Sequence, residues 1–381
     1  MRDVFYLSIT AFGGPQAHMA MFLDLLVNKR GYLTESELIE LHALCQILPG
    51  PTSTQTITAI GFRIGKANLA YLTLLIWMLP AITLMTSAAL VISTLNRNNI
   101  DLSFTRFIQP MAVAFVAHAA VKISQKVVTT SEGVALMIVS AFLAYHIKSP
   151  FLFPVILILS GLATSRKYKA LEQEDKAGIK ISWSNFVLWA IVFIGAASLG
   201  GLTQSLPVRL FENFYRNGSL IFGGGQVLIP LLYTEFVEFK AYLSGTEFLS
   251  GYALVQSIPG PVFSFSSYIG ALSMKSFGIG GEIIGALVAA LGIFLPGTFL
   301  IFFVIRFWNE LKKYRVVKAS IEGINAASSG MVIAAAFLMF KPLDDSAINY
   351  ILMIITFALL YFTKIPSPAI IAVGLIAGFV L

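Results

Sequence analysis

The sequence predicts an all-α polytopic membrane protein with two inverted-topology repeats. Each repeat contains broken, re-entrant helical hairpins, and an extra linking transmembrane helix joins the two. Three observations predict this: an apolar composition, an internal repeat, and prolines inside apolar runs. Of the 381 residues, 57% are hydrophobic and 12% charged, with a mean hydropathy of +0.82. Several apolar runs reach the roughly 20 residues that span a bilayer, which excludes an ordinary soluble enzyme.

The interruptions are two Pro-Gly-Pro motifs, at 49–51 and 259–261, which lie 210 positions apart. Proline lacks the backbone N–H and pushes the preceding residue out of the α conformation, so each motif breaks a helix. Pro51 and Pro261 suit the first turn of a new helix, whose free N–H groups and positive dipole end would face the break. At membrane depth, a break is tolerated where it lines a cavity or is buried by protein.

The spacing of 210 also joins other motifs into a repeat. Residues 12–16 match 222–226, and the pattern at 33–37 returns at 243–247. Because several separate motifs keep one register, we predict two copies of a single plan. The predicted units are a first repeat at 1–164, a basic loop with the linking helix at 165–210, and a second repeat at 211–381.

Each repeat should contain the same elements in order. Two broken hairpins come first, at 4–27 and 34–65 in the first repeat and at 211–238 and 244–275 in the second. Two long spans follow, at 68–95 and 106–128, then at 282–305 and 319–340. A pair of short apolar helices closes each repeat, at 132–147 and 151–164, then at 347–362 and 366–381. The linking helix is expected at 184–204.

Basic loops set the orientation. The loops 166–180 and 306–318 each carry five Lys or Arg residues, so both should be cytoplasmic. Between them lie the linking helix, two hairpins that return to their own side, and one long span, which is an even number of crossings. This count makes the second repeat inverted relative to the first. It places the N-terminus in the cytoplasm and the C-terminus outside.

The helix starts at the breaks predict an anion site. Pro15 follows Gly13 and Gly14 as Pro51 follows Gly50, so each repeat offers two helix N-termini. Unpaired N–H groups and the partial positive charge there can bind an anion without a buried lysine. Nearby hydroxyls and amides could replace the hydration shell of a tetrahedral oxyanion. The alternative is that the glycines allow close helix packing and the hydroxyls bond to preceding carbonyls.

The candidate substrate-binding residues are therefore the glycines and polar side chains at the four breaks. They are Gly13, Gly14, Gln16, His18, Gln46, Gly50, Thr52, Ser53, Thr54, Gln55, Gly223, Gly224, Gly225, Gln226, Gln256, Gly260 and Ser264. Thr56, Ser266 and Ser267 extend the same polar clusters.

Three residues are candidates for coupling transport to an ion gradient. Asp24 is an ionisable group inside an apolar run, although the neighbouring Lys29 allows it to reach the membrane surface. His18 titrates in a useful range, but its counterpart in the second repeat is Leu228. Lys122 could face an anion pathway or snorkel to the surface.

Other charged residues have a structural interpretation. Thr34 with Glu37 and Ser244 with Glu247 fit capping boxes before apolar runs. The cations Arg63, Lys66 and Lys275 end the second hairpins, where they could attract anions or set the topology. For His42 and His118 we expect satisfied positions in the core.

Absent motifs exclude several activities. The sequence contains no phosphate-binding loop, no His-Glu-x-x-His and no Gly-x-Ser-x-Gly, so ATP hydrolysis and membrane hydrolase chemistry lack support. The single cysteine, Cys45, excludes an intramolecular disulfide. We expect no enzyme activity, cofactor or metal. The net charge of +7 reflects cytoplasmic loops and does not indicate nucleic-acid binding.

The motifs taken together resemble one family. Residues 12–15 with His18, residues 48–51 with Thr54 and Gln55, and the second-half segments 222–225 and 258–263 are similar to the chromate transporter (CHR) family in its two-domain, long-chain form. The resemblance covers essentially the whole chain. It implies a transporter of chromate or a related oxyanion such as sulfate in the prokaryotic cytoplasmic membrane, driven by a proton or potential gradient.

The chain also departs from the family pattern. The family commonly has acidic pairs before the basic turn, where this chain has Leu23-Asp24 in one half and Thr234-Glu235 in the other. The basic turn itself keeps Lys29 and Arg30 in the first half but only Lys240 in the second.

The prediction is therefore a secondary transporter that exports a tetrahedral oxyanion by alternating access. Its partners are a small inorganic oxyanion and the lipid bilayer, with no nucleic acid, and a homodimer is left open. The alternatives are uptake or exchange of sulfate or another anion, a passive anion channel, and a flippase or enzyme acting on a phosphorylated lipid.

Overall fold

The computed structural model describes residues 1–100, 102–166, 181–222, 225–308 and 315–380. These residues form helices, and no strand occurs among them. Five helical stretches are long and apolar enough to cross a membrane: Thr52–Arg97, Ser103–Val127, Ser184–Thr203, Lys275–Val304 and Ala319–Phe340. The predicted all-α membrane fold is therefore confirmed.

The first half begins with short helices that are interrupted at the predicted breaks. Its elements are α1 (Arg2–Thr10), α2 (Gly14–Phe22), the π-helix η1 (Leu23–Lys29), α3 (Glu35–Ile47) and α4 (Thr52–Arg97). Gly13, Gly14 and Gly50 have φ angles of 93°, 77° and 121°, which L side chains rarely adopt. Gly65 and Lys66 are non-helical inside α4, so a kink separates the short first part of this helix from its long second part.

The second half repeats this order. Its elements are α9 (Leu206–Leu220), α10 (Gly225–Tyr233), the π-helix η4 (Thr234–Phe239), α11 (Gly245–Ser257), η5 (Val262–Ser264), α12 (Phe265–Ser273), η6 (Lys275–Phe277) and α13 (Gly278–Val304). A π-helix follows α2 in the first half and α10 in the second. The start of α9 precedes the predicted 211 because Pro207 occupies its first turn, where the fixed φ of proline favours a helix.

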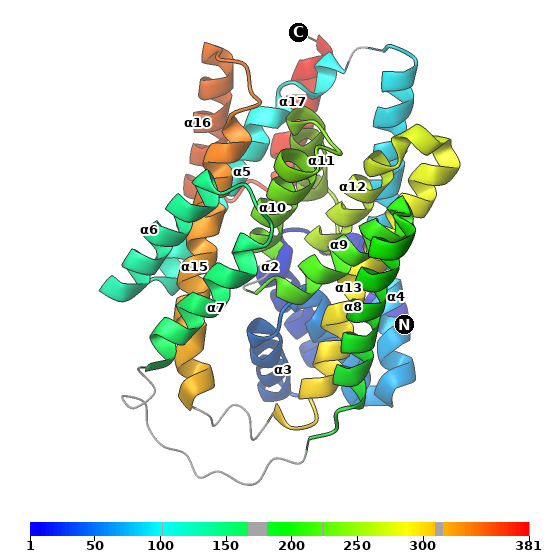
Figure 1. Ribbon diagram of the computed structural model, residues 1–381, viewed down its shortest axis with the longest axis vertical. Coiled ribbons are helices and arrows are strands. Elements are labelled where there is room, and N and C mark those ends of the chain that lie inside the picture. Colours follow the sequence, from blue (N-terminus) through cyan, green and yellow to red (C-terminus); the bar gives the residue numbers. More distant parts are fainter. Residues whose placement is uncertain (101, 167–180, 223–224, 309–314, 381) are drawn as a thin grey trace.

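The remaining helices of each half pack against helices of the other half. The first half contributes η2 (Ser103–Thr105), α5 (Ile108–Val127), α6 (Ser131–His146) and α7 (Leu152–Ser165), and the second contributes α15 (Arg315–Phe340), α16 (Ala347–Phe362) and α17 (Ser367–Val380). The pair α6 and α7 packs on α15, whereas α16 packs on α5, and α17 packs on η2, just before α5, and on α11 (Figure 1). The short helices of each half therefore cover a long helix of the other.

Glycines allow the close approach of these helices. A Cβ added to Gly323 on α15 would lie 2.0 Å from the Ser160 carbonyl oxygen on α7, and one on Gly330 would lie 2.1 Å from the Met137 carbonyl oxygen. Small residues at helix crossings serve the same purpose in other membrane proteins.

The linking helix α8 (Ser184–Thr203) connects the two halves. Figure 1 shows its start at the same end of the molecule as the end of α7, the end of α13 and the start of α15. These helix ends flank both loops that we predicted to be cytoplasmic. Residues 167–180 and 309–314 of those loops lie outside the described residues.

Candidate functional site

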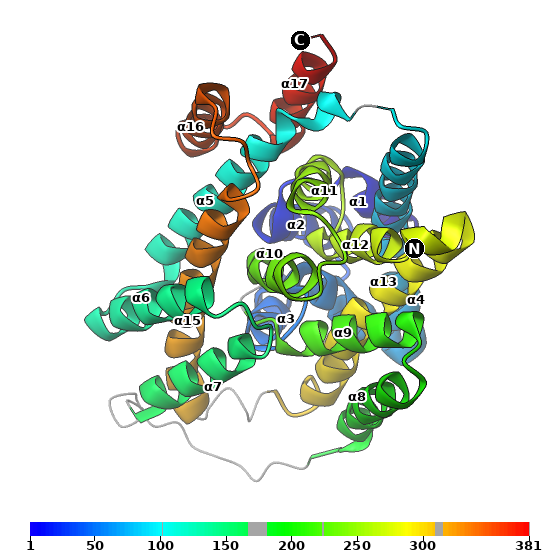
Figure 2. The ribbon, with the colours of Figure 1, turned by 45° about the horizontal axis from the view of Figure 1, so that its top comes forward.

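A small cavity lies where breaks from the two halves meet, and we call it the central cavity. It is lined by Gly14, Pro15 and His18 of the first break, Pro51, Thr52 and Ser53 of the second, and Pro261, Val262 and Phe263 of the fourth. Figure 2 shows α1, α2, α3 and α10 to α12 grouped in the middle, with the long and short helices around them. The volume is about 10 Å³, roughly the room for one water molecule.

Two reciprocal hydrogen bonds join the breaks of one half to the breaks of the other. The Gly50 N–H donates to the Ile221 carbonyl oxygen at 2.8 Å, and the Gly260 N–H donates to the Ala11 carbonyl oxygen at 2.9 Å. Positions 11 and 50 correspond to 221 and 260 in the repeat. The second break of each half therefore binds the first break of the other half.

The two glycines of these bonds have φ angles of 121° and 99°. A Cβ on Gly50 would lie 3.2 Å from the Gly297 Cα, and one on Gly260 would lie 2.9 Å from the Ala81 Cβ. Both conformation and space therefore require glycine here.

His18 forms part of the cavity wall contributed by α2. Its side chain is 1% exposed, and its Nε2 lies 3.1 Å from the Ala11 carbonyl oxygen. The rings of Phe22 and Trp77 stand 6.4 Å and 5.2 Å from the imidazole. Nδ1 is buried and has no hydrogen-bond partner among the described residues.

The polar residues at the start of α4 divide into two groups. Thr52 and Ser53 line the cavity. Thr54 instead accepts a bond from the Trp77 indole at 3.1 Å, and the Gln55 amide donates to the Pro49 carbonyl oxygen at 2.8 Å and to that of Gly297 at 3.2 Å. Thr54 therefore bonds the part of α4 beyond its kink, and Gln55 bonds the break itself and α13.

Three serines follow the fourth break. Ser264, Ser266 and Ser267 are 0% exposed, and their hydroxyl groups have no partner among the described residues. Buried polar groups are normally paired, so these hydroxyls, which follow the cavity-lining Phe263 in the sequence, are able to form further hydrogen bonds.

Other candidates lie away from the cavity or outside the described part of the chain. Gln46 is exposed and donates to His42 at 3.0 Å, and Gln256 hydrogen-bonds Tyr252. Gly225 begins α10. Gly223, Gly224 and the side chains of Gln16 and Gln226 are outside the described residues.

The coupling candidates other than His18 are also not among the residues that line the cavity. Asp24 forms an exposed ion pair with Lys29 at 2.7 Å, which agrees with the surface interpretation. The Lys122 ammonium lies 5.3 Å from the centre of the Tyr361 ring, a cation–π contact between α5 and α16. Their proposed role in coupling stays a prediction.

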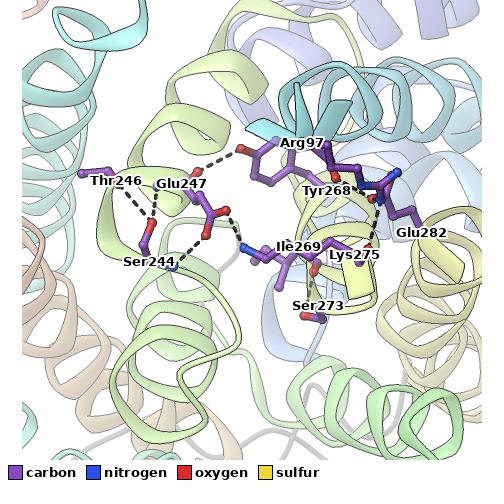
Figure 3. A network of polar contacts seen from close by, with 10 residues as sticks. Arg97, Ser244, Thr246, Glu247, Tyr268, Ile269, Ser273, Lys275 and Glu282 are labelled. Atoms are coloured by element: carbon purple, nitrogen blue, oxygen red, sulfur yellow. Dashed lines mark hydrogen bonds and ion pairs between the residues drawn. The ribbon is translucent and has the colours of Figure 1, made fainter. Parts of the chain in front are cut away.

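Both predicted capping boxes are confirmed, and each is joined by a cation. Glu37 caps α3 through Thr34, and Glu247 caps α11 through Ser244. Arg63 binds Glu37 and Lys275 binds Glu247, each at 2.7 Å, as Figure 3 shows for the second pair. Arg63 therefore joins α4 to the start of α3, and Lys275 joins η6 to the start of α11.

Sequence reasoning did not single out Glu282, and it named Glu235 without predicting that this carboxylate is buried. Glu282 is 0% exposed, binds Arg97 (Figure 3) and accepts a 2.5 Å hydrogen bond from Ser93. Glu235, also 0% exposed, binds Arg216 at 2.6 Å and Asn217 at 2.8 Å. The available signal was a carboxylate inside or beside an apolar run, which is unusual enough to mark a partner or a function.

The chain is similar to known transport proteins. The family model described as "Chromate transporter" matches residues 1–165 and 208–379. The "Probable chromate transport protein" of Synechococcus elongatus is 25% identical over 98% of this chain and 93% of its own length. The "Chromate transport protein" of Cupriavidus metallidurans is 24% identical over 98% of this chain and 90% of its own.

An uncharacterised transporter of Methanocaldococcus jannaschii is also similar, with 23% identity over 98% of this chain and 92% of its own length. No solved structure matches the chain.

Proposed function

The chain belongs to the chromate transporter family, and on that premise we propose that it carries chromate or a related tetrahedral oxyanion, such as sulfate, across the prokaryotic cytoplasmic membrane as a secondary transporter. The observation that carries the proposal is the meeting of helix breaks from both halves at the central cavity. Breaks of this kind at membrane depth commonly build the substrate sites of transporters.

The N-termini of α2 and α4 supply the attraction for the anion. The Gln55 N–H bonds the Pro51 carbonyl oxygen and begins the regular helix, which leaves the N–H groups of Thr52 and Ser53 free of intrahelical partners. These residues line the cavity, so their amides and the positive ends of the helix dipoles would bind a negative substrate. The serine hydroxyls after the fourth break would complete its hydrogen bonding.

Alternating access accounts for the small volume of the cavity. A tetrahedral oxyanion has five heavy atoms, and a cavity of about 10 Å³ holds about one water molecule. The breaks must therefore separate to admit it. In the proposed cycle, two inverted repeats, matching the two parts of the family model at 1–165 and 208–379, open the site first to the cytoplasm and then to the outside. The N-terminus is cytoplasmic, the C-terminus is outside, and a gradient drives export.

Flux through proteoliposomes tests this function. We expect saturable chromate uptake and counterflow by loaded vesicles, with sulfate competing. Ser264→Ala and Thr52→Val should each weaken chromate affinity about tenfold, the effect of losing one hydrogen bond to a charged group. Current without counterflow would identify a channel. Transfer of a phosphorylated lipid with no anion flux would identify a flippase. Either result would reject the proposal.

Gly195→Ala is the matched control. Gly195 lies on α8 with open space around its Cβ position, and its substitution should leave the affinity unchanged.

A further inference from the structure

The contact between His18 and Ala11 determines the tautomer of the buried imidazole. A carbonyl oxygen can only accept, so Nε2, 3.1 Å from the Ala11 oxygen, must carry a hydrogen and donate. In the neutral ring, Nδ1 therefore holds a lone pair and can only accept. It becomes a donor only when the imidazole is protonated.

The tautomer is held firmly because the Ala11 carbonyl is itself fixed. The same oxygen accepts the Gly260 N–H at 2.9 Å, one of the two reciprocal bonds between the halves. Rotating the imidazole to present Nε2 to the cavity would leave this buried carbonyl with one donor fewer. The His18 ring is also confined by Phe22 and Trp77.

Charged groups on the neighbouring elements are engaged elsewhere. On η1, Asp24 pairs with Lys29 at the surface. On α4, Arg63 pairs with Glu37, Arg97 pairs with Glu282, and Lys66 is exposed. The groups that the structure puts against the imidazole are the Ala11 carbonyl and the rings of Phe22 and Trp77. No described carboxylate bonds it, so an added proton would need a negative charge in the cavity to stabilise it.

We propose that His18 binds a proton whenever the anion binds. A divalent oxyanion and one proton then occupy the central cavity together. The inference rests on the proposed function, because it names the coupling ion for that site. The proton comes from the solution to which the cavity is open and binds Nδ1. The N–H so formed donates to an oxyanion oxygen. On release the hydrogen bond breaks, and both the anion and the proton leave.

The repeat indicates one proton for each anion. The position that corresponds to His18 is Leu228, which is 0% exposed and cannot titrate. A dianion with one proton keeps one negative charge, so a membrane potential that is negative inside would still favour its export.

Sulfate is the probe for the test, because it remains a dianion across the neutral range whereas chromate itself takes up a proton there. Calorimetric titration of the detergent-solubilised full chain, repeated in buffers of different ionisation enthalpy, measures the protons taken up with each sulfate. We expect uptake of up to one proton with each sulfate and an affinity that falls as the pH rises, by at most about tenfold per pH unit.

His18→Gln and His118→Gln provide the comparison. The side-chain amide introduced by His18→Gln can still donate to Ala11, and this variant should bind sulfate with no proton uptake and no dependence on pH. His118 also has a buried ring nitrogen without a described partner but lies outside the cavity lining, so its substitution should leave the proton uptake intact.

The outcomes separate the two proposals. Sulfate binding by the unmodified chain without proton uptake, or uptake that persists in His18→Gln, would overturn the role of His18 and leave the oxyanion function standing. If neither sulfate nor chromate binds, the proposed function fails, and this inference fails with it. Because the first measurement uses the unmodified chain, it holds even if His18→Gln does not fold.

Discussion

Removing the charge of Glu235 should destabilise the protein strongly. Its carboxylate is 0% exposed and lies 2.6 Å from Arg216, whose side chain is 9% exposed. Asn217 donates to the other oxygen at 2.8 Å, and the Lys240 ammonium lies 3.8 Å away. Glu235→Gln keeps the size and one acceptor but leaves the Arg216 charge without its buried partner.

The magnitude follows from burial. Breaking a buried ion pair by removing one partner costs about 3–5 kcal/mol, because a desolvated charge is left uncompensated. Arg216 keeps a second carboxylate, Glu212, at 3.1 Å, but that side chain is 21% exposed and water screens it more. We therefore expect a loss near the lower limit, about 3 kcal/mol, for Glu235→Gln and about 1 kcal/mol or less for the matched variant Glu212→Gln.

The assay is unfolding in mixed micelles with increasing SDS. Cys45 is the single cysteine and is 0% exposed, so its labelling by a thiol-reactive dye reports unfolding. Far-UV circular dichroism should give a coincident transition if unfolding is cooperative.

A double variant checks the physical cause. The repeat places the uncharged residues Tyr6 and Leu25 opposite Arg216 and Glu235, so the fold of a half does not require this ion pair. Arg216→Met combined with Glu235→Leu should recover more than half of the loss, because apolar residues of similar volume often replace a buried pair at little cost. If Glu235→Gln and Glu212→Gln lose equal stability, the buried-charge argument is wrong.

Two further predictions concern a glycine at a helix break and a carboxylate at a helix start. Gly260→Ala should lower stability by about 1–2 kcal/mol or more, because φ is 99° and the left-handed region costs that much for a residue with a Cβ; Gly195→Ala, in the same unfolding assay, should be neutral, and equal effects would refute the strain argument. Hydrogen bonds from Thr34 and then Arg63 lower the pKa of Glu37 below 4.5. The ionised carboxylate therefore stabilises the start of α3 above that pH. This contribution is lost as the pH falls through the lowered pKa. Glu37→Gln should flatten the acid limb of a plot of unfolding midpoint against pH, and an unchanged limb would contradict it.

Much of the local structure could be predicted from the sequence. The breaks at Pro49–Pro51 and Pro259–Pro261 follow from the missing N–H and fixed φ of proline. The two capping boxes follow from a hydroxyl three residues before a glutamate. These features depend on neighbours within a turn of helix, so the order of residues is enough to specify them.

The residues that line the candidate site could not be predicted from the sequence to the same extent. The sequence indicated that polar residues cluster after the breaks, but it could not separate Thr52 and Ser53, which line the cavity, from Thr54 and Gln55, which bond Trp77 and Gly297. That division depends on how α13 and the part of α4 beyond its kink pack beside the start of α4.

The sequence by itself determined the membrane class, the order of helices and breaks, and the family. Only the tertiary structure decided that Gly50 bonds Ile221 and Gly260 bonds Ala11, that the short helices cover the opposite half, and that Arg216 neutralises Glu235. Hydropathy and backbone chemistry act over a few residues and can be read along the chain. Contacts between distant segments depend on how whole helices pack, where shape and the pairing of buried polar groups select one arrangement.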